Sequence, residues 1–348
     1  MKTTLIGSIP TLNPTEAVEL IFRYVSVPCW PQLPKRSFKE HMCPQYSENF
    51  PGIQIDENEQ KIWLEEEKFY LEVESFYQNY LDKNFDFFKI SKDYSLGFYE
   101  FVETIKFEKP KEIKLQTTGP ITFGLTVKTK QGQAIFYNEQ FREPIEKHLV
   151  LKSLWQIKTI LESLKEKTSI ILFYDEPYLA AYGSAFTSIS KEEIIASLEK
   201  TISETKQLVQ EVFLNKIELR IGIHCCANTD WSLLTSLKEL DIISFDTYEF
   251  FESFLVYSNE IKDFVAQNKK IAWGIIPNSD KILNESFDSL ANKLSLVFEK
   301  LINKGVNLNK NNVENEIITP QCGLGGVNLQ VLEKILQICS YFNNIKKL

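Results

Sequence analysis

The stretch "TSIILFYDEP", residues 168–177, indicates the fold of this chain. It is a continuous apolar run that ends in two carboxylates and a proline, without the alternation that marks a half-exposed strand. A strand of this kind is buried on both faces, which is typical of a parallel sheet covered by helices. The segment that follows begins with "SKEE" (190–193), a capping box, and continues with apolar residues at helical spacing.

Strand and helix patterns alternate along the chain on both sides of this stretch. Six more segments have the pattern of strands: 3–8, 112–120, 217–224, 241–246, 269–277 and 316–326. Helical patterns are found from Pro14, at 57–82, 136–165, 190–212, 251–267 and 284–303, and from 327. Seven strands, with room for an eighth in 86–101, predict an α/β fold, a parallel (β/α)8 TIM barrel. No GxGxxG follows the first strand, which argues against an open dinucleotide-binding sheet.

Length, composition and net charge limit the classes of protein to which this chain can belong. The chain has 348 residues, 43% of them hydrophobic, which is enough for one large core, and we predict a single catalytic domain over 1–348. A net charge of -8 argues against nucleic-acid and membrane-surface partners. The sequence has no transmembrane run and no signal-peptide pattern. Six cysteines in a chain of this size do not form a disulfide scaffold, so we expect a cytoplasmic protein with free thiols.

A long segment lies between the first helix and the second predicted strand. It contains "VPCWPQLPKRSFKEHMCPQYSENFPG" (27–52), which is too long for an ordinary connection in an α/β barrel. Its aromatic residues and prolines predict a packed lid or docking surface over the barrel mouth, which we place at 27–56. A plain Ω-loop that covers the barrel is the alternative.

Polar residues gather where the predicted strands end, at the mouth of the barrel. His224 and Cys226 are two residues apart, so both side chains leave an extended chain on one face. Cys322 ends the last strand and Asp246 ends another. One imidazole, two thiolates and a carboxylate suit a tetrahedral Zn²⁺ ion. The alternative is that these cysteines are small buried hydrophobes, which is the interpretation we adopt for Cys225.

Other strand ends suit an amino-acid ligand. Asp175 and Glu176 would attract an ammonium group, although the same pair could instead cap the following turn. Ser8 and the backbone amides around Gly7 could hold a carboxylate. His148 is expected at the surface of a helix.

Seven motifs, taken in order, resemble the catalytic half of cobalamin-independent methionine synthase. They are "TTLIGSIP" (3–10), "TTGPITFG" (117–124), "FYDEP" (173–177), "IGIHCCANTDW" (221–231), "DIISFD" (241–246), "IAWGIIP" (271–277) and "TPQCGLGG" (319–326). The chain thus resembles a single-barrel member of the methionine synthase and uroporphyrinogen decarboxylase superfamily, from residue 3 to about 326. The specific part is H-x-C followed by P-x-C-G, which the decarboxylases lack.

The resemblance implies a ligand set and an activity. In the family, the I-G-S loop and the Asp of D-E-P hold homocysteine, which corresponds here to Ile6, Gly7, Ser8 and Asp175. The implied zinc ligands are His224, Cys226, Cys322 and an acid. The acid is Asp246 where full-length synthases have Glu, and Glu249 is the alternative. The implied activity is a zinc-dependent methyltransferase reaction that converts homocysteine to methionine.

Three other functions remain open at this stage. One is a methyltransferase of the same superfamily that acts on another thiol, such as coenzyme M, although a sulfonate does not match the acids of "DEP". Another is a metal-free decarboxylase of a tetrapyrrole, which needs arginines where the N-terminal region has only Arg23 and Arg36. The last is a non-catalytic protein with a structural zinc ion.

The methyl donor is a separate expectation. Folate-using synthases pair their catalytic barrel with an N-terminal one, whereas this chain has the catalytic barrel alone. Short barrels that resemble it take methyl groups from a methylated corrinoid. We therefore expect methylcobalamin, free or on a corrinoid protein, to be the donor, and methyltetrahydrofolate to be a poor one.

Overall fold

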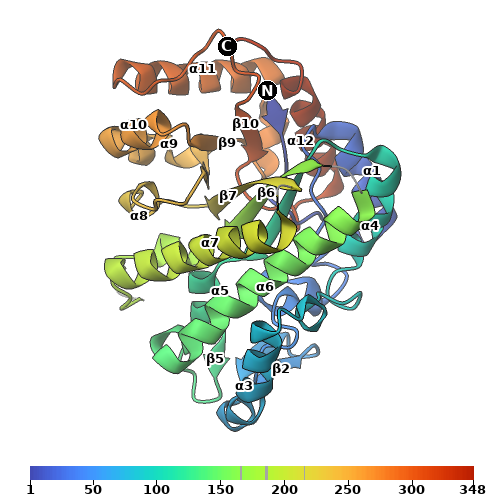
Figure 1. Cartoon of the computed structure of the whole chain (residues 1–348). Helices are drawn as coiled ribbons and strands as arrows, with labels where there is room; N and C mark the ends of the chain where they lie inside the picture. Colours follow the sequence, from blue (N-terminus) through green and yellow to red (C-terminus); the bar gives the residue numbers. More distant parts are fainter. Residues whose placement is uncertain (165–166, 185–186, 215) are drawn as a thin grey trace.

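The computed structural model describes residues 1–164, 167–184, 187–214 and 216–348. Its centre is a sheet of seven parallel strands, in the order β1-β10-β9-β8-β7-β6-β4, that curves into a barrel (Figure 1). The strands are β1 (Lys2–Thr3), β4 (Glu112–Thr118), β6 (Thr168–Asp175), β7 (Ile217–Cys225), β8 (Ile242–Phe245), β9 (Lys270–Ile276) and β10 (Ile317–Pro320). The predicted parallel α/β barrel is confirmed, and each strand overlaps a predicted segment, although β1 shares only Thr3 with the predicted 3–8.

The eighth place in the barrel is taken by residues 27–32, which lie between β1 and β4. Val27 N donates to Thr3 O at 2.9 Å, and Lys114 N donates to Pro28 O at 2.9 Å. Parallel bridges also join Ser8 to Gln32 and Cys29 to Lys114. These contacts connect β1 to β4 through 27–32, which we call the eighth stave.

The eighth strand predicted in 86–101 is wrong. Residues Phe85–Phe88 form a short 3-10 helix, and α4 (Leu96–Glu108) begins soon afterwards. The sequence pattern missed the eighth stave because Pro28 and Pro31 have no N–H group to donate to a neighbouring strand, which leaves isolated bridges in place of a continuous ladder.

Helices surround the barrel (Figure 1). The longer ones are α1 (Pro14–Tyr24), α4, α6 (Glu139–Leu164), α7 (Lys191–Phe213), α9 (Thr247–Leu255), α10 (Ser258–Ala266), α11 (Phe287–Asn303) and α12 (Leu329–Phe342). Short helices are α2 (Met42–Gln45), α5 (Pro120–Thr126) and α8 (Ser232–Thr235). The capping box of α7 is present, with Ser190 and Glu193 bonded reciprocally. The helix predicted at 251–267 is two helices, α9 and α10. Within the described residues, no helix has the length and apolar character that crossing a membrane requires.

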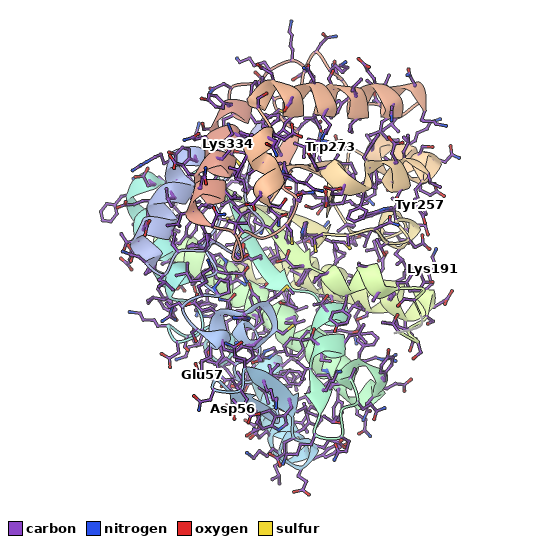
Figure 2. All side chains as sticks on the ribbon, turned by 180° about the vertical axis from the view of Figure 1, so that it is seen from behind. Asp56, Glu57, Lys191, Tyr257, Trp273 and Lys334 are labelled. Carbon is purple, nitrogen blue, oxygen red and sulfur yellow. The ribbon has the colours of Figure 1, made fainter. Side chains whose placement is uncertain are left out.

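The helix predicted at 57–82 is only partly correct. Its second part is α3 (Glu66–Leu81), but its first part belongs to an antiparallel hairpin of β2 (Ile53–Asp56) and β3 (Lys61–Leu64). The side chain of Asp56 accepts from the backbone N–H groups of Asn58 and Glu59, an arrangement that favours a turn over a helix. In the view of Figure 2, Asp56 and Glu57 lie far from Lys334 of α12.

The expected surface position of His148 is wrong. Its ring is fully buried on α6 and is packed among Phe50, Phe76 and Phe88, and its Nε2 lies 2.7 Å from Tyr46 O. The charged neighbours of His148 in the sequence suggested exposure. In the structure, the segment around Tyr46 and Phe50 packs onto this face of α6.

The interior of the barrel is a small apolar cluster of Val27, Ile171, Phe173, Ile242, Ala272 and Ile317. Ile171 and Phe173 point inward from β6, and Asp175 follows on the same face because side chains alternate along a strand. A Cβ at Gly222 would lie 2.5 Å from the Phe173 ring, so the ring fills the barrel beneath β7. The apolar interior therefore ends just below Asp175.

Candidate metal centre and substrate cavity

Three potential metal ligands meet where β7 and β10 end. The ligand atoms of His224, Cys226 and Cys322 all lie within 4.8 Å of one another. Asp175 pairs with His224 in the register of β6 and β7, which places both on the inward face. Cys225 lies between the two β7 ligands in sequence and packs in the outer core, as expected from strand alternation.

The imidazole of His224 is oriented by one nitrogen and open at the other. Its Nδ1 lies 3.0 Å from Ser244 Oγ on β8, whereas its Nε2 is buried without a hydrogen-bond partner among the described residues. Metal-ligating histidines are commonly held in this way through their second nitrogen. The unpartnered Nε2 and the two nearby sulfur atoms together form a donor set that suits a zinc ion.

The contact between the two thiols shifts the pKa of each in opposite directions. A hydrogen bond from Cys322, followed by the interaction with His224, lowers the pKa of the Cys226 thiol despite its burial. The same hydrogen bond, together with burial, raises the pKa of the Cys322 thiol. Cys226 is thus the sulfur that ionises first. A cation bound here would displace the thiol protons.

The loop that carries Cys322 is joined to the loop after β1. Gly325 N donates to Ser8 Oγ at 3.1 Å, and Leu324 N donates to Ser8 O at 2.9 Å. A Cβ at Gly323 would lie 2.2 Å from Ser8 Oγ, so a larger residue there would displace this hydroxyl from Gly325 N. The predicted substrate loop and the late cysteine therefore form one unit.

The two candidate acids of β8 and α9 have different surroundings. Asp246 is buried and caps α9 by accepting from Glu249 N at 2.9 Å, and Gln321 Nε2 lies 3.0 Å from both of its carboxylate oxygens. Burial raises the pKa of Asp246. Glu249 points outward and pairs with Lys281 at 2.5 Å. Neither acid belongs to the three-residue cluster found among the described residues.

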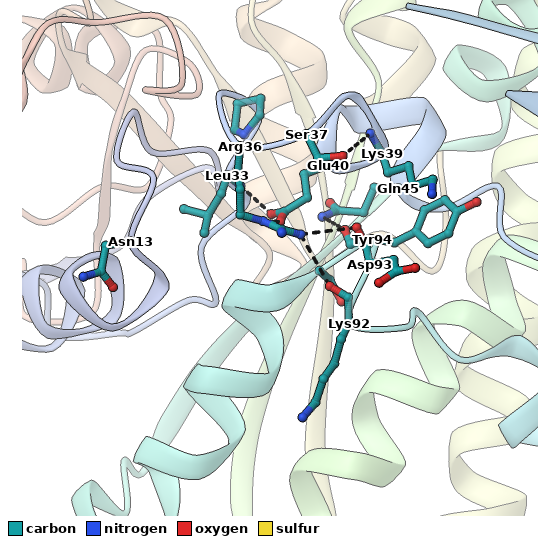
Figure 3. A network of polar contacts seen from close by, with 12 residues as sticks. Asn13, Leu33, Arg36, Ser37, Lys39, Glu40, Gln45, Lys92, Asp93 and Tyr94 are labelled. Atoms are coloured by element: carbon teal, nitrogen blue, oxygen red, sulfur yellow. Dashed lines mark hydrogen bonds and ion pairs between the residues drawn. The ribbon is translucent and has the colours of Figure 1, made fainter. Parts of the chain in front are cut away.

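A cavity of about 620 Å³ opens above the cluster. Its described lining residues are Ile6, Ser8, Gln32, Pro34, Lys35, Glu40, His41, Met42, Asp175, Pro177, His224, Cys226, Cys322, Gly323, Gly325 and Gly326. Residues 34–42, from the predicted lid, thus form one wall of the cavity. Figure 3 shows how this wall is held: Arg36 pairs with the buried Glu40 and also donates to the backbone carbonyls of Lys92 and Asp93.

Asp175 brings an unpaired carboxylate oxygen to this cavity. Its Oδ1 is buried with no hydrogen-bond partner among the described residues. Burial raises the pKa of Asp175 to about 6, against the opposing effects of Lys114 and His224. A ligand with a positively charged donor would satisfy this oxygen and offset the cost of its burial.

Glu176 has a different position from Asp175. It is fully buried and is not among the described residues that line the cavity. Its carboxylate accepts from Ile121 N at 2.9 Å, Thr122 N at 2.7 Å and Thr122 Oγ1 at 2.6 Å, which caps the start of α5. Burial raises the pKa of Glu176 to about 7. Glu176 thus caps α5, an earlier element of the chain, whereas the alternative considered from the sequence was that the pair caps the turn that follows it.

Lys114 is a buried cation that sequence reasoning missed. Its Nζ lies against Ile6 O, 3.1 Å from Gln116 Oε1 and 5.0 Å from the centre of the Phe173 ring. Burial lowers the pKa of Lys114, and Asp175 opposes this shift. The signal was present in "EIKLQTT" (112–118), where Lys114 and Gln116 alternate with Ile113 and Leu115 and so share one face.

Comparisons with known proteins were made on sequence and on structure. No protein-family model and no curated protein matches the sequence. A B12-independent methionine synthase from Shewanella sp. W3-18-1, solved in complex with selenomethionine, has a similar structure. Its TM-score is 0.58 at 16% sequence identity, over 97% of this chain and 95% of that one. A methyltransferase from Methanosarcina mazei superposes with a TM-score of 0.52 at 10% identity, over 98% and 94% of the two chains. At these identities, the comparisons show a shared barrel fold.

Proposed function

We propose that this protein is a zinc-dependent methyltransferase that transfers a methyl group to the thiol of homocysteine and forms methionine. The observation that carries this proposal is the cluster of His224, Cys226 and Cys322, with its orphaned imidazole nitrogen, at the base of a cavity that also contains Asp175. Both solved structures described above are named as enzymes of methyl transfer, which is consistent with it.

The residues at the mouth would hold the metal and the substrate in distinct places. His224 Nε2 and the sulfur atoms of Cys226 and Cys322 would bind zinc, and we propose that Asp246, held by Gln321, completes the ligand set. A bound zinc ion favours the thiolate form of a substrate thiol, which otherwise ionises with a pKa near 8.5. Zinc sites of this type keep one position for an exchangeable ligand.

The substrate backbone would lie across the loop after β1. Asp175 would accept from the ammonium group, and Ser8 with the neighbouring backbone amides would hold the carboxylate. This arrangement would direct the homocysteine sulfur toward the cysteines. There the thiol would lose its proton to solvent, and the thiolate would form the new S–CH3 bond while the electron pair of the broken methyl–donor bond stays on the donor. The walls contributed by residues 34–42 would exclude water from this reaction.

We propose methylcobalamin or a methylated corrinoid protein as the donor. A second cavity of about 470 Å³ shares Met42 and Pro177 with the first, and none of its described lining residues is charged. Such a surface suits a donor whose side chains are uncharged amides better than a folate with several carboxylates. The similar methionine synthase is named B12-independent, so a folate is the competing donor.

Two alternatives from the sequence fit the cavity less well. A tetrapyrrole decarboxylase needs arginines, but Arg23 is exposed on α1, and Arg36 is occupied by Glu40 and two backbone carbonyls. A thiol such as coenzyme M presents a sulfonate, which Asp175 would repel.

The test is a methyl-transfer assay on zinc-loaded protein. Homocysteine is supplied with methylcobalamin or with methyltetrahydrofolate, and methionine is measured. We expect methionine from methylcobalamin; methionine from the folate alone would overturn the donor, and none from either would overturn the activity. X-ray absorption distinguishes a structural zinc site, because such a site gains no sulfur ligand when homocysteine is added.

A further inference from the structure

Lys114 brings a positive charge into the interior of the barrel. The side chain is fully buried on β4, and its ammonium lies 5.0 Å from the centre of the Phe173 ring. Its hydrogen-bond acceptors are two uncharged oxygen atoms, Ile6 O and Gln116 Oε1. Among the described residues, no carboxylate accepts a hydrogen bond from it. A buried ammonium without a direct counter-charge is costly to keep, so we looked for a function that requires it.

The Gln116 side chain determines where the Lys114 ammonium can bind. Gln116 Nε2 donates to Trp30 O at 2.8 Å, and a carbonyl oxygen can only accept, so Gln116 presents its Oε1 to Lys114. The same amide lies beneath Gly7, since a Cβ at that position would be 3.1 Å from the Cδ and Nε2 atoms of Gln116. Lys114 and Gln116 therefore support the loop after β1 from below.

The hydrogen bond from Lys114 sets the direction of one peptide group in that loop. Ile6 O accepts from the ammonium inside the barrel. The C=O and N–H of a trans peptide point in opposite directions, so the N–H of Gly7, in the same peptide, is turned away from the interior. Gly7 N and Ser8 N have no acceptor among the described residues. Ile6 and Ser8, on either side of Gly7, both line the cavity.

We propose that Lys114 is a positioning residue for the carboxylate of the substrate. By holding Ile6 O, it keeps the free N–H groups of Gly7 and Ser8 available to the carboxylate, and its charge lies beneath the bound anion. This inference rests on the proposed function and extends it. Asp175 and Lys114 then supply the negative and the positive charge that complement a zwitterionic amino acid. A thiol without a carboxylate would gain nothing from Lys114.

The test compares homocysteine with 3-mercaptopropylamine, which differs only by lacking the carboxylate. Lys114→Met removes the ammonium and keeps a long side chain that suits the apolar interior of the barrel. We expect kcat/KM for homocysteine to fall by about tenfold to a hundredfold, the worth of a hydrogen bond to a charged group, and kcat/KM for 3-mercaptopropylamine to stay within about twofold. Calorimetric titration of both thiols onto the zinc-loaded protein should show the same difference in Kd.

Lys152→Met is the matched control. Lys152 is also a fully buried lysine that donates to a backbone carbonyl, Lys89 O at 2.7 Å, but it does not line the cavity. This variant should leave kcat/KM for both thiols unchanged. 4-Mercaptobutanoate, which has the carboxylate and lacks the amine, tests the other role that Lys114 could have. A variant that weakens 3-mercaptopropylamine and spares 4-mercaptobutanoate would show that Lys114 serves the amine, which contradicts our proposal.

A second variant keeps Lys114 and does not depend on how Lys114→Met folds. Gln116→Met removes one of the two acceptors of the ammonium, so homocysteine should weaken in the same direction but by less. Equal losses for homocysteine and 3-mercaptopropylamine, or no loss in either variant, would overturn the role of Lys114. If the unchanged protein neither binds nor methylates homocysteine, the proposed function fails instead.

Discussion

At the scale of single residues, the site depends on which atoms are already occupied. Ser244 engages one nitrogen of His224 and leaves the other facing the two thiols. Gln321 and the start of α9 engage Asp246, whereas Asp175 keeps a free oxygen. We expect the two unpartnered atoms, His224 Nε2 and Asp175 Oδ1, to contact metal and substrate directly, whereas Asp246 would bind the metal while it is held in place by Gln321.

The first prediction concerns zinc. Cys226→Ser and Cys322→Ser should each lose most of the bound zinc, because a serine hydroxyl does not ionise to replace a thiolate ligand. Metal analysis of the purified variants measures this. Cys225→Ala is the matched control, since its side chain packs in the outer core, and it should keep its zinc. Stoichiometric zinc in both serine variants would show that the metal lies elsewhere.

The second prediction separates the two acids. Asp246→Asn should weaken zinc binding, whereas Glu249→Gln should leave it nearly unchanged because Glu249 is paired with Lys281 on the outside. Competition with a chelator of known affinity gives both values. Zinc lost only from the Glu249 variant would reverse the assignment.

The third prediction concerns Asp175. Asp175→Asn should raise the KM for homocysteine by about tenfold to a hundredfold, because it removes a charged acceptor for the ammonium. The zinc content should be unchanged, since Asp175 is not one of the clustered ligands. A KM equal to that of the unchanged protein would remove Asp175 from the substrate site.

At the scale of elements, the contact between the loop after β1 and the loop after β10 can be tested by adding a methyl group at Gly323. Gly323→Ala should destabilise the protein by about 1–3 kcal/mol and weaken zinc binding, because the new Cβ would lie 2.2 Å from Ser8 Oγ. Thermal unfolding and zinc competition measure these effects. Gly326→Ala in the same loop is the control, with no atom within 4 Å of its Cβ. Similar behaviour of the two variants would mean that this contact does not hold the site.

Strands and helices that can be recognised from their own consecutive residues could be predicted from the sequence. The strand β6 is a continuous apolar run, and the polar ends of β6 and β7 indicated where Asp175 and His224 would meet. The eighth stave could not be recognised because prolines disrupt its ladder, and the β2–β3 hairpin was hidden within a charged run that resembles a helix.

Buried polar side chains were the other part that could not be predicted. Lys114 and Gln32 have partners far away in sequence, at Ile6 for the lysine and at Gln45 and Tyr46 for the glutamine. Glu176 was grouped with Asp175 because the two are adjacent, but alternation along the chain sends Glu176 to the start of α5. Only the packed fold reveals these pairings.

At the scale of the whole molecule, a buried lysine should make stability depend on pH. Burial lowers the pKa of Lys152 on α6 to about 7 from its ordinary 10.5. The unfolded chain therefore holds more protons than the folded one between these values, so this residue contributes stability as pH rises from about 7 to 10.5. Below pH 7 the cost of burying the charge is present in full.

Lys152→Met tests this effect. The variant should be more stable than the unchanged protein at pH 7, by on the order of 3 kcal/mol, and the difference should shrink toward pH 10. Chemical unfolding at several pH values measures it. Lys158→Met on the same helix is the control, because Lys158 is partly exposed and pairs with Asp86. A pH-independent difference for Lys152→Met would contradict a buried charge.

The eighth stave also has a consequence for how the chain acquires its fold. Strands β4, β6, β7, β8, β9 and β10 follow one another along the barrel in chain order, so each can pair soon after its neighbour is synthesised. Closing the barrel requires contacts between segments that are far apart in the sequence. Strand β1 must pair with β10, where Lys2 lies opposite Ile317, and residues 27–32 must contact β4. Contacts of such long sequence separation form late. The meeting of Ser8 with the Cys322 loop should therefore be among the last events of folding, and metal added earlier would encounter a Cys322 loop that Ser8 does not yet hold.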